Sequence, residues 1–236
     1  MKRVVLYFLG GVALCIGVFL WDSQGAVPAG AVGTAGYVAL TFDDGPWPGT
    51  TRVLLDGLKE REAKATFFVI GKQIATRPEL IQRMVQEGHQ IGLHTWDHVA
   101  LRGLGAGEVS RQLEKSRAAL VELVGEQDFM LRPPYGFVDE TVKQCAGGPI
   151  ICWSVDTEDW RDEDVARIVK AAVEDVRDGD IILMHDIFRS SVDAALECVD
   201  ELQRRGFALV TVEELFTLRG REPAAGEVYR KVPPGE

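Results

Sequence analysis

Two adjacent aspartates, Asp43 and Asp44, end the apolar run of residues 37–42 and are followed at once by Gly45 and Pro46. Asp-Gly-Pro is ordinary turn chemistry, so this stretch alone indicates no more than a solvated turn. Two carboxylates at the end of a buried strand could instead serve one site, because successive strand residues point to opposite sides. One carboxylate could then bind a metal ion while its neighbour accepts a proton.

Two of the four histidines, His94 and His98, stand four residues apart in "HTWDH". If a helical turn follows the preceding strand, both imidazoles lie on one face and can reach one metal ion. Two histidines and one carboxylate leave a coordination position open for water or substrate. Thr95 occupies the position that a glutamate base holds in H-E-x-x-H proteases, which argues against that class. His89 is expected to hydrogen-bond in the loop that enters its strand.

Several apolar runs end in a charged residue or an imidazole. The residues at these ends are Asp43, His94, Arg132, Asp156 with Asp159, and His185. In parallel barrels the C-terminal ends of the strands form the active-site face, so we expect these side chains to converge. Arg132 could then pair with Asp43 and orient it as a base. A carboxylate beside His185 would raise the pKa of the imidazole and keep it available as a proton donor.

Short apolar runs alternate with segments of helical period along most of the chain. The expected strands are 38–42, 65–70, 90–93, 129–131, 150–155, 181–184 and 208–212. Helices are expected over 165–176 and 192–202, the second ended by Gly206, and also over 76–88 and 107–125. This alternation predicts an α/β fold with a parallel sheet inside helices. The absence of a G-x-G-x-x-G turn favours a distorted barrel of about seven strands over a doubly wound sheet.

The N-terminus carries Lys2 and Arg3 before an uncharged, mostly apolar run. Residues 1–22 are therefore expected to be a signal peptide or a membrane anchor that places the following domain outside the cytoplasm. Residues 23–36 are rich in Gly, Ala and Val and predict a linker. A single domain is expected over 37–218, and the non-periodic segment 219–236 is expected to be a flexible tail.

The composition excludes some partners. The 236 residues carry a net charge of −10 without a basic cluster, which argues against nucleic acid and anionic lipid. Cys145, Cys152 and Cys198 are expected to be buried free thiols, with one disulfide pair as the alternative. A monomer is expected.

Five short motifs, "TFDDGP", "HTWDH", "RPPYG", "DTEDW" and "LMH", occur in one order along residues 36–218. In order and approximate spacing they resemble the motifs of the NodB-homology polysaccharide deacetylases, carbohydrate esterase family 4. The resemblance covers essentially the whole expected domain. It implies a distorted (β/α) barrel and a metal-dependent N-deacetylase that acts on N-acetylglucosamine polymers.

The resemblance also implies a role for each motif residue. Asp43 would be the catalytic base, and Asp44, His94 and His98 would bind one divalent metal ion, with zinc the expected metal. Arg132 would tether Asp43, and Asp159 would tune His185 as the general acid. The backbone N–H of Tyr135 would help to hold the oxyanion, and Leu183 and Trp160 would line the groove. Trp153 is expected in the core, and Asp97 is expected to cap a loop.

Peptidoglycan is the expected substrate because of the export segment and because "WSVDTEDW" and "ILMHDI" resemble bacterial peptidoglycan deacetylases. Chitin oligomers are the alternative within the same chemistry. An acetyl-xylan esterase is less favoured because it would not need His185 as a strong acid. A glycosidase could use paired carboxylates but would leave the histidine pair without a purpose. A non-catalytic wall-binding module would be expected to lack a base or a ligand, and neither is missing.

Overall fold

The computed structural model describes residues 35–235. The expected signal peptide or anchor, and all but the last two residues of the expected linker, lie outside the described residues. Among residues 35–235 no helix is both long enough and apolar enough to cross a membrane.

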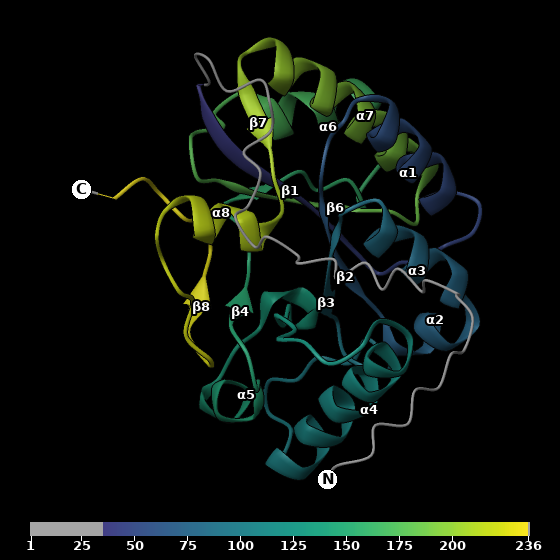
Figure 1. Cartoon of the computed structure of the whole chain (residues 1–236), viewed down its shortest axis with the longest axis vertical. Coiled ribbons are helices and arrows are strands. Elements are labelled where there is room, and N and C mark those ends of the chain that lie inside the picture. Colours follow the sequence, from purple (N-terminus) through teal and green to yellow (C-terminus); the bar gives the residue numbers. More distant parts are fainter. Residues whose placement is uncertain (1–34, 236) are drawn as a thin grey trace, which may run out of the picture. The chain divides into compact units, whose positions relative to one another are not determined.

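A parallel sheet forms the centre of the domain. The strands are β1 (Gly36–Asp43), β2 (Thr66–Val69), β3 (Gln90–Leu93), β4 (Ile150–Ile151), β5 (Val155–Asp156), β6 (Ile181–His185), β7 (Phe207–Leu209) and β8 (Val228–Tyr229). Strand β1 lies in the middle of the order β3-β2-β1-β6-β5, and its first residues also pair with β7 (Figure 1). Strands β4 and β8 pair separately. The predicted α/β fold with a parallel sheet is confirmed.

Helices cover the sheet. They are α1 (Thr51–Glu60), α2 (Gly71–Thr76), α3 (Pro78–Gln86), α4 (Ala106–Val124), α5 (Glu140–Cys145), α6 (Val165–Val173), α7 (Arg189–Arg204) and α8 (Val212–Leu218). Helix α7 packs against α1 and α6, and α4 packs against α2, α3 and α5 (Figure 1). The four helices expected from periodicity are present. Gly206 follows the end of α7 with a φ of 86°, a left-handed conformation that suits glycine.

The sheet is less regular between β3 and β5. The predicted strand 129–131 contributes only Leu131, which forms single bridges to Leu93 and Ile150. The predicted strand 150–155 is split into β4 and β5. The Arg132 side chain donates hydrogen bonds to the carbonyl oxygens of Ile151 and Cys152, so these groups are satisfied by a guanidinium and not by a neighbouring strand. A continuous barrel ladder is therefore not formed here.

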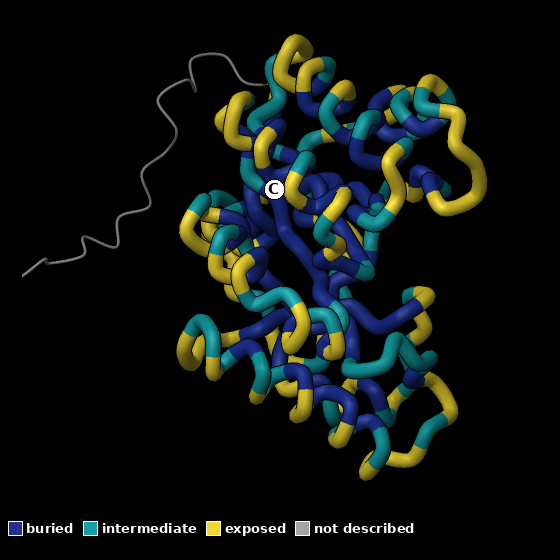
Figure 2. Tube along the Cα trace, turned by 90° about the vertical axis from the view of Figure 1, so that its right-hand side faces the viewer, coloured by how far each residue is buried: buried dark blue, intermediate teal, exposed yellow. Residues whose placement is uncertain are grey.

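The two faces of the strands have different surroundings. Leu40 and Phe42 of β1 belong to the large core under the helices. Ala39, on the opposite face, packs in a smaller cluster with residues of α8 such as Phe216. Thr41 and Asp43 share the face of Ala39, which we call the inner face, because side chains alternate along a strand. Figure 2 shows that most of the chain at the centre of the domain is buried, and all but one residue of β1 and of β6 are buried. Helix α8 thus covers one end of the inner face and leaves the end near Asp43 for the site.

The flexible tail expected over 219–236 is a wrong prediction for the described residues. Strand β8 pairs with β4 in parallel, Val232 is fully buried, and its N–H donates to the carbonyl of Gly179 at 2.7 Å. Val232 joins the cluster that α8 forms on the inner face. The apolar residues of this segment are too few and too scattered to produce a periodic signal.

Candidate active site

One cavity of about 450 Å³ collects most of the predicted site residues. Its lining consists of Asp43, Asp44, His94, His98, Tyr135, Trp153, Asp156, Trp160, Leu183, His185 and Phe188. The register of the parallel sheet explains part of this gathering, because Asp43, the last residue of β1, lies opposite His185, the last residue of β6. The expected convergence at the C-terminal strand ends is therefore present.

Arg132 lies behind the cavity and orients Asp43. Its Nη1 donates to Asp43 Oδ1 at 2.8 Å and to Thr41 Oγ1 at 2.7 Å. The guanidinium carbon lies 4.2 Å from the ring centroid of Phe68, and the whole arginine is inaccessible to solvent. The other oxygen of Asp43, Oδ2, lies 3.8 Å from His94 Nε2. The predicted contact is present, and it leaves one carboxylate oxygen directed at the histidine pair.

Asp44, His94 and His98 form a compact group whose ligand atoms lie within 4.8 Å of one another. Asp44 Oδ1 lies 3.4 Å from His94 Nε2 and 3.1 Å from His98 Nε2. His94 Nδ1 lies 2.7 Å from the carbonyl oxygen of Arg132, which can only accept a hydrogen bond. Nδ1 therefore carries the proton, and the Nε2 lone pair faces Asp44, as is usual for a metal-binding histidine.

These residues fit a divalent metal ion. Asp44 Oδ1 is buried and has no hydrogen-bond partner other than the two imidazoles. Burial alone would raise the pKa of Asp44, but protonated His94 and His98 rings would hold that pKa far below its usual value. With neutral rings, a metal ion between the three residues would supply the same positive charge. An ionised oxygen that faces imidazole lone pairs needs a cation between them. Two nitrogens and one carboxylate oxygen are a common set for a catalytic metal with open positions.

The helical turn predicted for residues 94–98 is not formed. Thr95 and His98 have φ values of 63° and 59°, so the chain after β3 is an irregular loop. This loop brings His98 back toward His94, with ring centroids 5.0 Å apart. The two histidines lie together as expected, but the geometry that joins them is not helical.

Asp44 also departs from the strand geometry expected for it. Its φ is 75°, so the chain turns at this residue and both adjacent carboxylates approach His94. Opposite orientations, as in a continued strand, are therefore a wrong prediction. Tyr135 and Glu158, in two other loops near the cavity, also have positive φ values. Such conformations cost free energy in residues other than glycine and often occur at functional sites.

His185 is held by Asp159. Their Nδ1 and Oδ1 atoms lie 2.7 Å apart, and the His185 backbone N–H donates to Oδ2, also at 2.7 Å. Burial alone would lower the pKa of His185, but the hydrogen bond and the charge of Asp159 outweigh burial and raise the pKa to about 9. The imidazole is thus protonated at neutral pH and keeps Nε2 for the cavity.

A family model described as polysaccharide deacetylase matches residues 31–147. The chain is 40% identical over 205 residues to the chitooligosaccharide deacetylase of Sinorhizobium fredii, a match that covers 80% of this chain and 95% of that protein. The chain belongs to the polysaccharide deacetylase family. The resemblance drawn from the five motifs is thereby confirmed.

Two further relatives match this chain over most of its length but differ in how much of their own length is covered. The peptidoglycan-N-acetylglucosamine deacetylase PgdA of Listeria monocytogenes is 41% identical over 192 residues, which cover 81% of this chain and 41% of that protein. The chain thus spans about two fifths of the length of that relative. A solved family 4 acetyl xylan esterase from Clostridium thermocellum, in complex with cobalt, is 31% identical with a TM-score of 0.79, covering 84% of this chain and 99% of that one.

The cavity of this polysaccharide deacetylase domain has an aromatic rim. Tyr135 and Trp160 are each 59% exposed, whereas Leu183 lies deep in the cavity and is almost fully buried. Trp153, expected in the core, is half-buried and lines the cavity instead, and its Nε1 donates to Asp156 Oδ2 at 3.1 Å. Phe188 was not anticipated. Trp153 and Phe188 both stand close to strand ends in the sequence, and this position could have predicted that they line the cavity.

A buried carboxylate beside the site, Asp186, was also not anticipated. It follows His185 directly, is almost fully buried and accepts a hydrogen bond from the Thr51 hydroxyl. Burial raises the pKa of Asp186 to about 7, and the negative charge of Asp44 raises it further by a smaller amount. The hydrogen bond from Thr51 acts in the opposite direction but does not outweigh burial. Gly45 packs directly on this carboxylate and has no room for a Cβ atom. Asp186 therefore supports the turn that carries Asp44.

His89 has the structural role expected of it, but Asp97 does not cap its loop, because the N–H groups of Trp96 and Asp97 donate to Gln112 Oε1. His89 is buried, and its Nδ1 accepts from the Ala65 N–H at 3.2 Å. Asp97 accepts from the Gln112 side chain at 3.0 Å and pairs with Lys72, outside the metal group.

The three cysteines of the described chain are free. Cys152 and Cys198 are buried as predicted, whereas Cys145 is partly exposed, so burial is a wrong prediction for this one residue.

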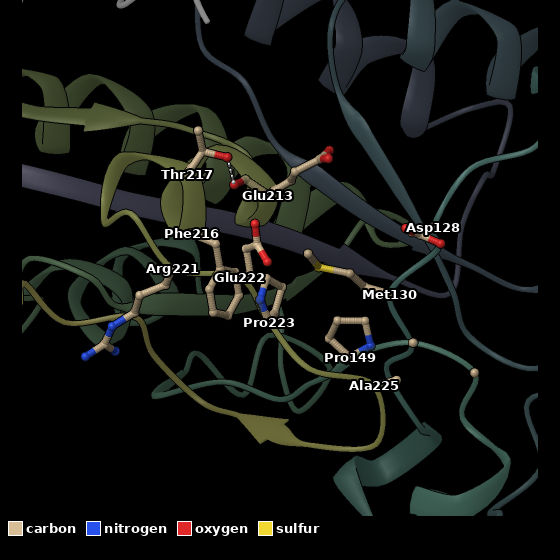
Figure 3. A pocket seen from close by; sticks show the side chains of 12 residues that line it. Asp128, Met130, Pro149, Glu213, Phe216, Thr217, Arg221, Glu222, Pro223 and Ala225 are labelled. Atoms are coloured by element: carbon tan, nitrogen blue, oxygen red, sulfur yellow. Dashed lines mark hydrogen bonds between the residues drawn. The ribbon is translucent and has the colours of Figure 1, made fainter.

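A second cavity of about 410 Å³ lies beside α8, where the smaller core cluster reaches the surface (Figure 3). Figure 3 shows Met130 and Phe216 at its apolar side, with Glu213 and Glu222 nearby. No histidine or cysteine belongs to its lining among the described residues. The histidine-containing group that could hold a metal ion, Asp44, His94 and His98, lines the first cavity.

Proposed function

We propose that this domain is a metal-dependent deacetylase that removes N-acetyl groups from N-acetylglucosamine residues of cell-wall polysaccharide and releases acetate. One observation carries the proposal. The ligand group Asp44, His94 and His98 shares a single cavity with a carboxylate held by an arginine and with an imidazole held by a carboxylate. This set contains a base, an acid and a cation site, which are the parts that amide hydrolysis requires.

A divalent metal ion, when bound, lowers the pKa of water and polarises a substrate carbonyl. Asp43, oriented by Arg132, accepts a proton from the attacking water. The water oxygen bonds to the acetyl carbon, and the carbon–nitrogen bond then breaks. His185, kept protonated by Asp159, donates its Nε2 proton to the departing nitrogen. The products are acetate and a free amine on the sugar.

Three residues of the cavity wall would position the substrate. We assign the backbone N–H of Tyr135 to the carbonyl oxygen, where negative charge develops during the reaction. Leu183 supplies an apolar surface for the acetyl methyl group, and the exposed ring of Trp160 supplies a face for the sugar. These assignments follow the family motifs and agree with the lining of the cavity.

Zinc is the metal that we propose. Two imidazole nitrogens and one carboxylate oxygen form a ligand set of intermediate hardness, which suits zinc. The cobalt complex of the Clostridium thermocellum esterase indicates that a related domain accepts a neighbouring metal of the same row.

Peptidoglycan is the proposed substrate because the Listeria monocytogenes relative is named for it and because the N-terminal segment predicts export. We propose that the domain acts outside the cytoplasm as a monomer, after a signal peptide or behind a membrane anchor. Chitooligosaccharides are the second candidate, supported by the Sinorhizobium fredii relative. An acetyl-xylan substrate is less favoured, since an ester leaving group does not need the strongly protonated His185.

The test compares acetate release from peptidoglycan, chitooligosaccharides and acetyl-xylan by the full chain. Chelation should abolish release, and zinc should restore it. Asp43→Asn should be inactive on all three substrates. Acetate release that survives chelation would argue for a metal-free deacetylase, whereas release of shorter sugars without acetate would argue for a glycosidase. Binding of peptidoglycan without acetate release in the presence of metal would instead indicate a wall-binding module. N-terminal sequencing of the exported protein would distinguish a cleaved signal from a retained anchor.

A further inference from the structure

A row of neighbouring aromatic rings leads away from the metal group, from His98 past Tyr135 to Phe137. The rings of His98 and Tyr135 lie 5.1 Å apart between centroids, and those of Tyr135 and Phe137 lie 5.9 Å apart. The guanidinium carbon of Arg102 lies 4.1 Å from the centroid of Phe137. Phe137 is 41% exposed and Arg102 is exposed as well. The row therefore connects the reacting centre to a positive charge at the surface.

The charge of Arg102 distinguishes it from the other arginines near the cavity. Arg161 follows Trp160 and pairs with Glu158 at 2.9 Å, and Arg189 follows Phe188 and pairs with Asp193 at the same distance. Within residues 35–235, Arg102 has no carboxylate oxygen within 4.0 Å of its guanidinium. Its face rests on a ring, so the N–H groups at its edge remain available for a planar anion.

The position of Arg102 is held by the backbone. Its neighbour Gly103 donates its N–H to Asp139 Oδ2 at 2.9 Å, and Asp139 Oδ1 accepts from the Val142 N–H at the same distance. Hydrogen bonds from backbone N–H groups, those of Val142 and Gly103 foremost, lower the pKa of the Asp139 carboxyl, and the charge of Arg102 adds the smallest effect. Both Asp139 oxygens are thus engaged by backbone groups. Through the hydrogen bond from Gly103 to Asp139, the loop that carries Arg102 is held next to the segment that carries Phe137.

We propose that Arg102, stacked on Phe137, is a subsite for a carboxylate carried by a sugar that flanks the reacting acetamide. The inference rests on the proposed function and refines it to acidic glycans. A sugar ring can stack on the exposed rings of the row, since its C–H face is apolar. A carboxylate on that sugar then meets the free edge of the guanidinium. Peptidoglycan carries such acids on alternate sugars, as a lactyl group or at its attached peptide, whereas chitooligosaccharides are neutral.

The test uses substitutions of Arg102 that either remove its positive charge or keep the charge on a group of different shape. Arg102→Met keeps an apolar chain over Phe137 but removes the cation, and Arg102→Lys keeps the charge without the planar fork. Arg161→Met is the matched control, because Arg161 directly follows the rim residue Trp160 but is already paired with Glu158. The three variants and the wild type are compared on acidic glycan oligomers with peptides, on peptide-free ones, and on chitooligosaccharides of equal length.

Arg102→Met should raise KM on acidic oligomers roughly three- to tenfold, the size expected of an exposed charge-assisted contact, with kcat unchanged. KM on chitooligosaccharides should not change, and Arg102→Lys should recover part of the loss. Added salt should raise KM for acidic oligomers in the wild type but not in Arg102→Met. The lactyl carboxyl is an amide wherever a peptide is attached, so an effect only on peptide-bearing oligomers assigns the carboxylate to the peptide, and an effect only on peptide-free oligomers assigns it to the lactyl group. An effect on both kinds shows that the subsite accepts either carboxylate.

Binding separates this proposal from the proposed reaction. In the Asp43→Asn background, calorimetric titration measures affinity for acidic oligomers without turnover. Arg102→Met should weaken that affinity by the same factor by which it raises KM. If the wild type released no acetate, the proposed reaction would be overturned, but this difference in affinity would still support the subsite. Equal affinities with and without Arg102, or equal losses for acidic and neutral oligomers, would overturn the subsite.

Discussion

Arg132 Nη1 lies 2.8 Å from Asp43 Oδ1, and neither side chain is more than 5% exposed. Every nitrogen of this guanidinium donates to an oxygen of the protein, so the buried charge is paired and makes four hydrogen bonds. The pair lies on the inner face between the cluster under α8 and the cavity. It links the stability of the domain to the orientation of the proposed base.

Replacing Arg132 by methionine should destabilise the domain by about 3–5 kcal/mol, because it leaves the Asp43 carboxylate buried without its partner. Acetate release should fall as well, since the proposed base loses its orientation. Denaturant unfolding measures the first effect. Arg61→Met breaks the more exposed pair with Asp200 and should cost only about 0–1 kcal/mol. Equal losses in the two variants would argue against the role given to the buried pair.

The pH dependence of activity should report the pair of His185 and Asp159. With the pKa of His185 raised to about 9, the proton donor is present at neutral pH and is lost as the pH rises toward 9. A bound metal ion adds positive charge nearby, so the alkaline limb of kcat should lie at or below pH 9. Asp159→Asn removes the charge that raises the pKa, so the limb should move to lower pH. An unchanged limb would exclude His185 as the acid.

The same shift predicts a change in stability with pH. A histidine with a raised pKa in the folded state contributes stability that is fully present below its unfolded pKa of about 6.5. That contribution is lost as the pH rises through about 9. Chemical denaturation of the wild type between pH 6 and pH 10 should therefore show a loss that is smaller in Asp159→Asn. Parallel curves for the two proteins would contradict the shift.

Gly45→Ala should weaken metal binding. The added Cβ would overlap the carboxylate of Asp186 and push the turn that carries Asp44. Overpacking of this kind costs about 1–3 kcal/mol, and displaced support of a ligand lowers metal affinity roughly tenfold or more. Gly49→Ala is the control, because a Cβ there meets nothing within 4 Å. Metal titration that gives equal affinities for the two variants would show that Asp186 does not support the turn.

The C-terminal segment should contribute to stability. Val232 is fully buried against the cluster under α8, so Val232→Ala should cost about 2 kcal/mol from lost burial and the cavity left behind. Val85→Ala, at an exposed position of α3, should change the free energy of unfolding by less than about 0.5 kcal/mol. If the two variants unfold at the same denaturant concentration, the segment does not stabilise the domain.

Much of the candidate site could be predicted from the sequence, because its residues stand at the ends of apolar runs. Asp43, His94 and His185 were predictable because apolar runs stop at them, and a parallel sheet brings such ends to one edge. The loops were not predictable in detail. The left-handed backbone of Asp44 and His98 depends on contacts with distant segments, and no local pattern announces it.

The missed residues have a similar explanation. Trp153 was expected in the core because tryptophan in an apolar run is normally buried, but the strand breaks there where Arg132 takes the backbone carbonyls of Ile151 and Cys152. Strand β8 was missed because its only partner is the two-residue β4. Both features depend on contacts between segments that are distant in the sequence, and the periodicity of apolar residues carries no information about such contacts.

The most direct test of the central claim separates the two adjacent aspartates. Metal content after dialysis and acetate release are measured for the wild type, Asp43→Asn and Asp44→Ala. We predict about one metal ion per chain in the wild type and in Asp43→Asn, little metal in Asp44→Ala, and acetate release by the wild type alone. Full turnover by Asp43→Asn, or undiminished metal binding by Asp44→Ala, would contradict the account.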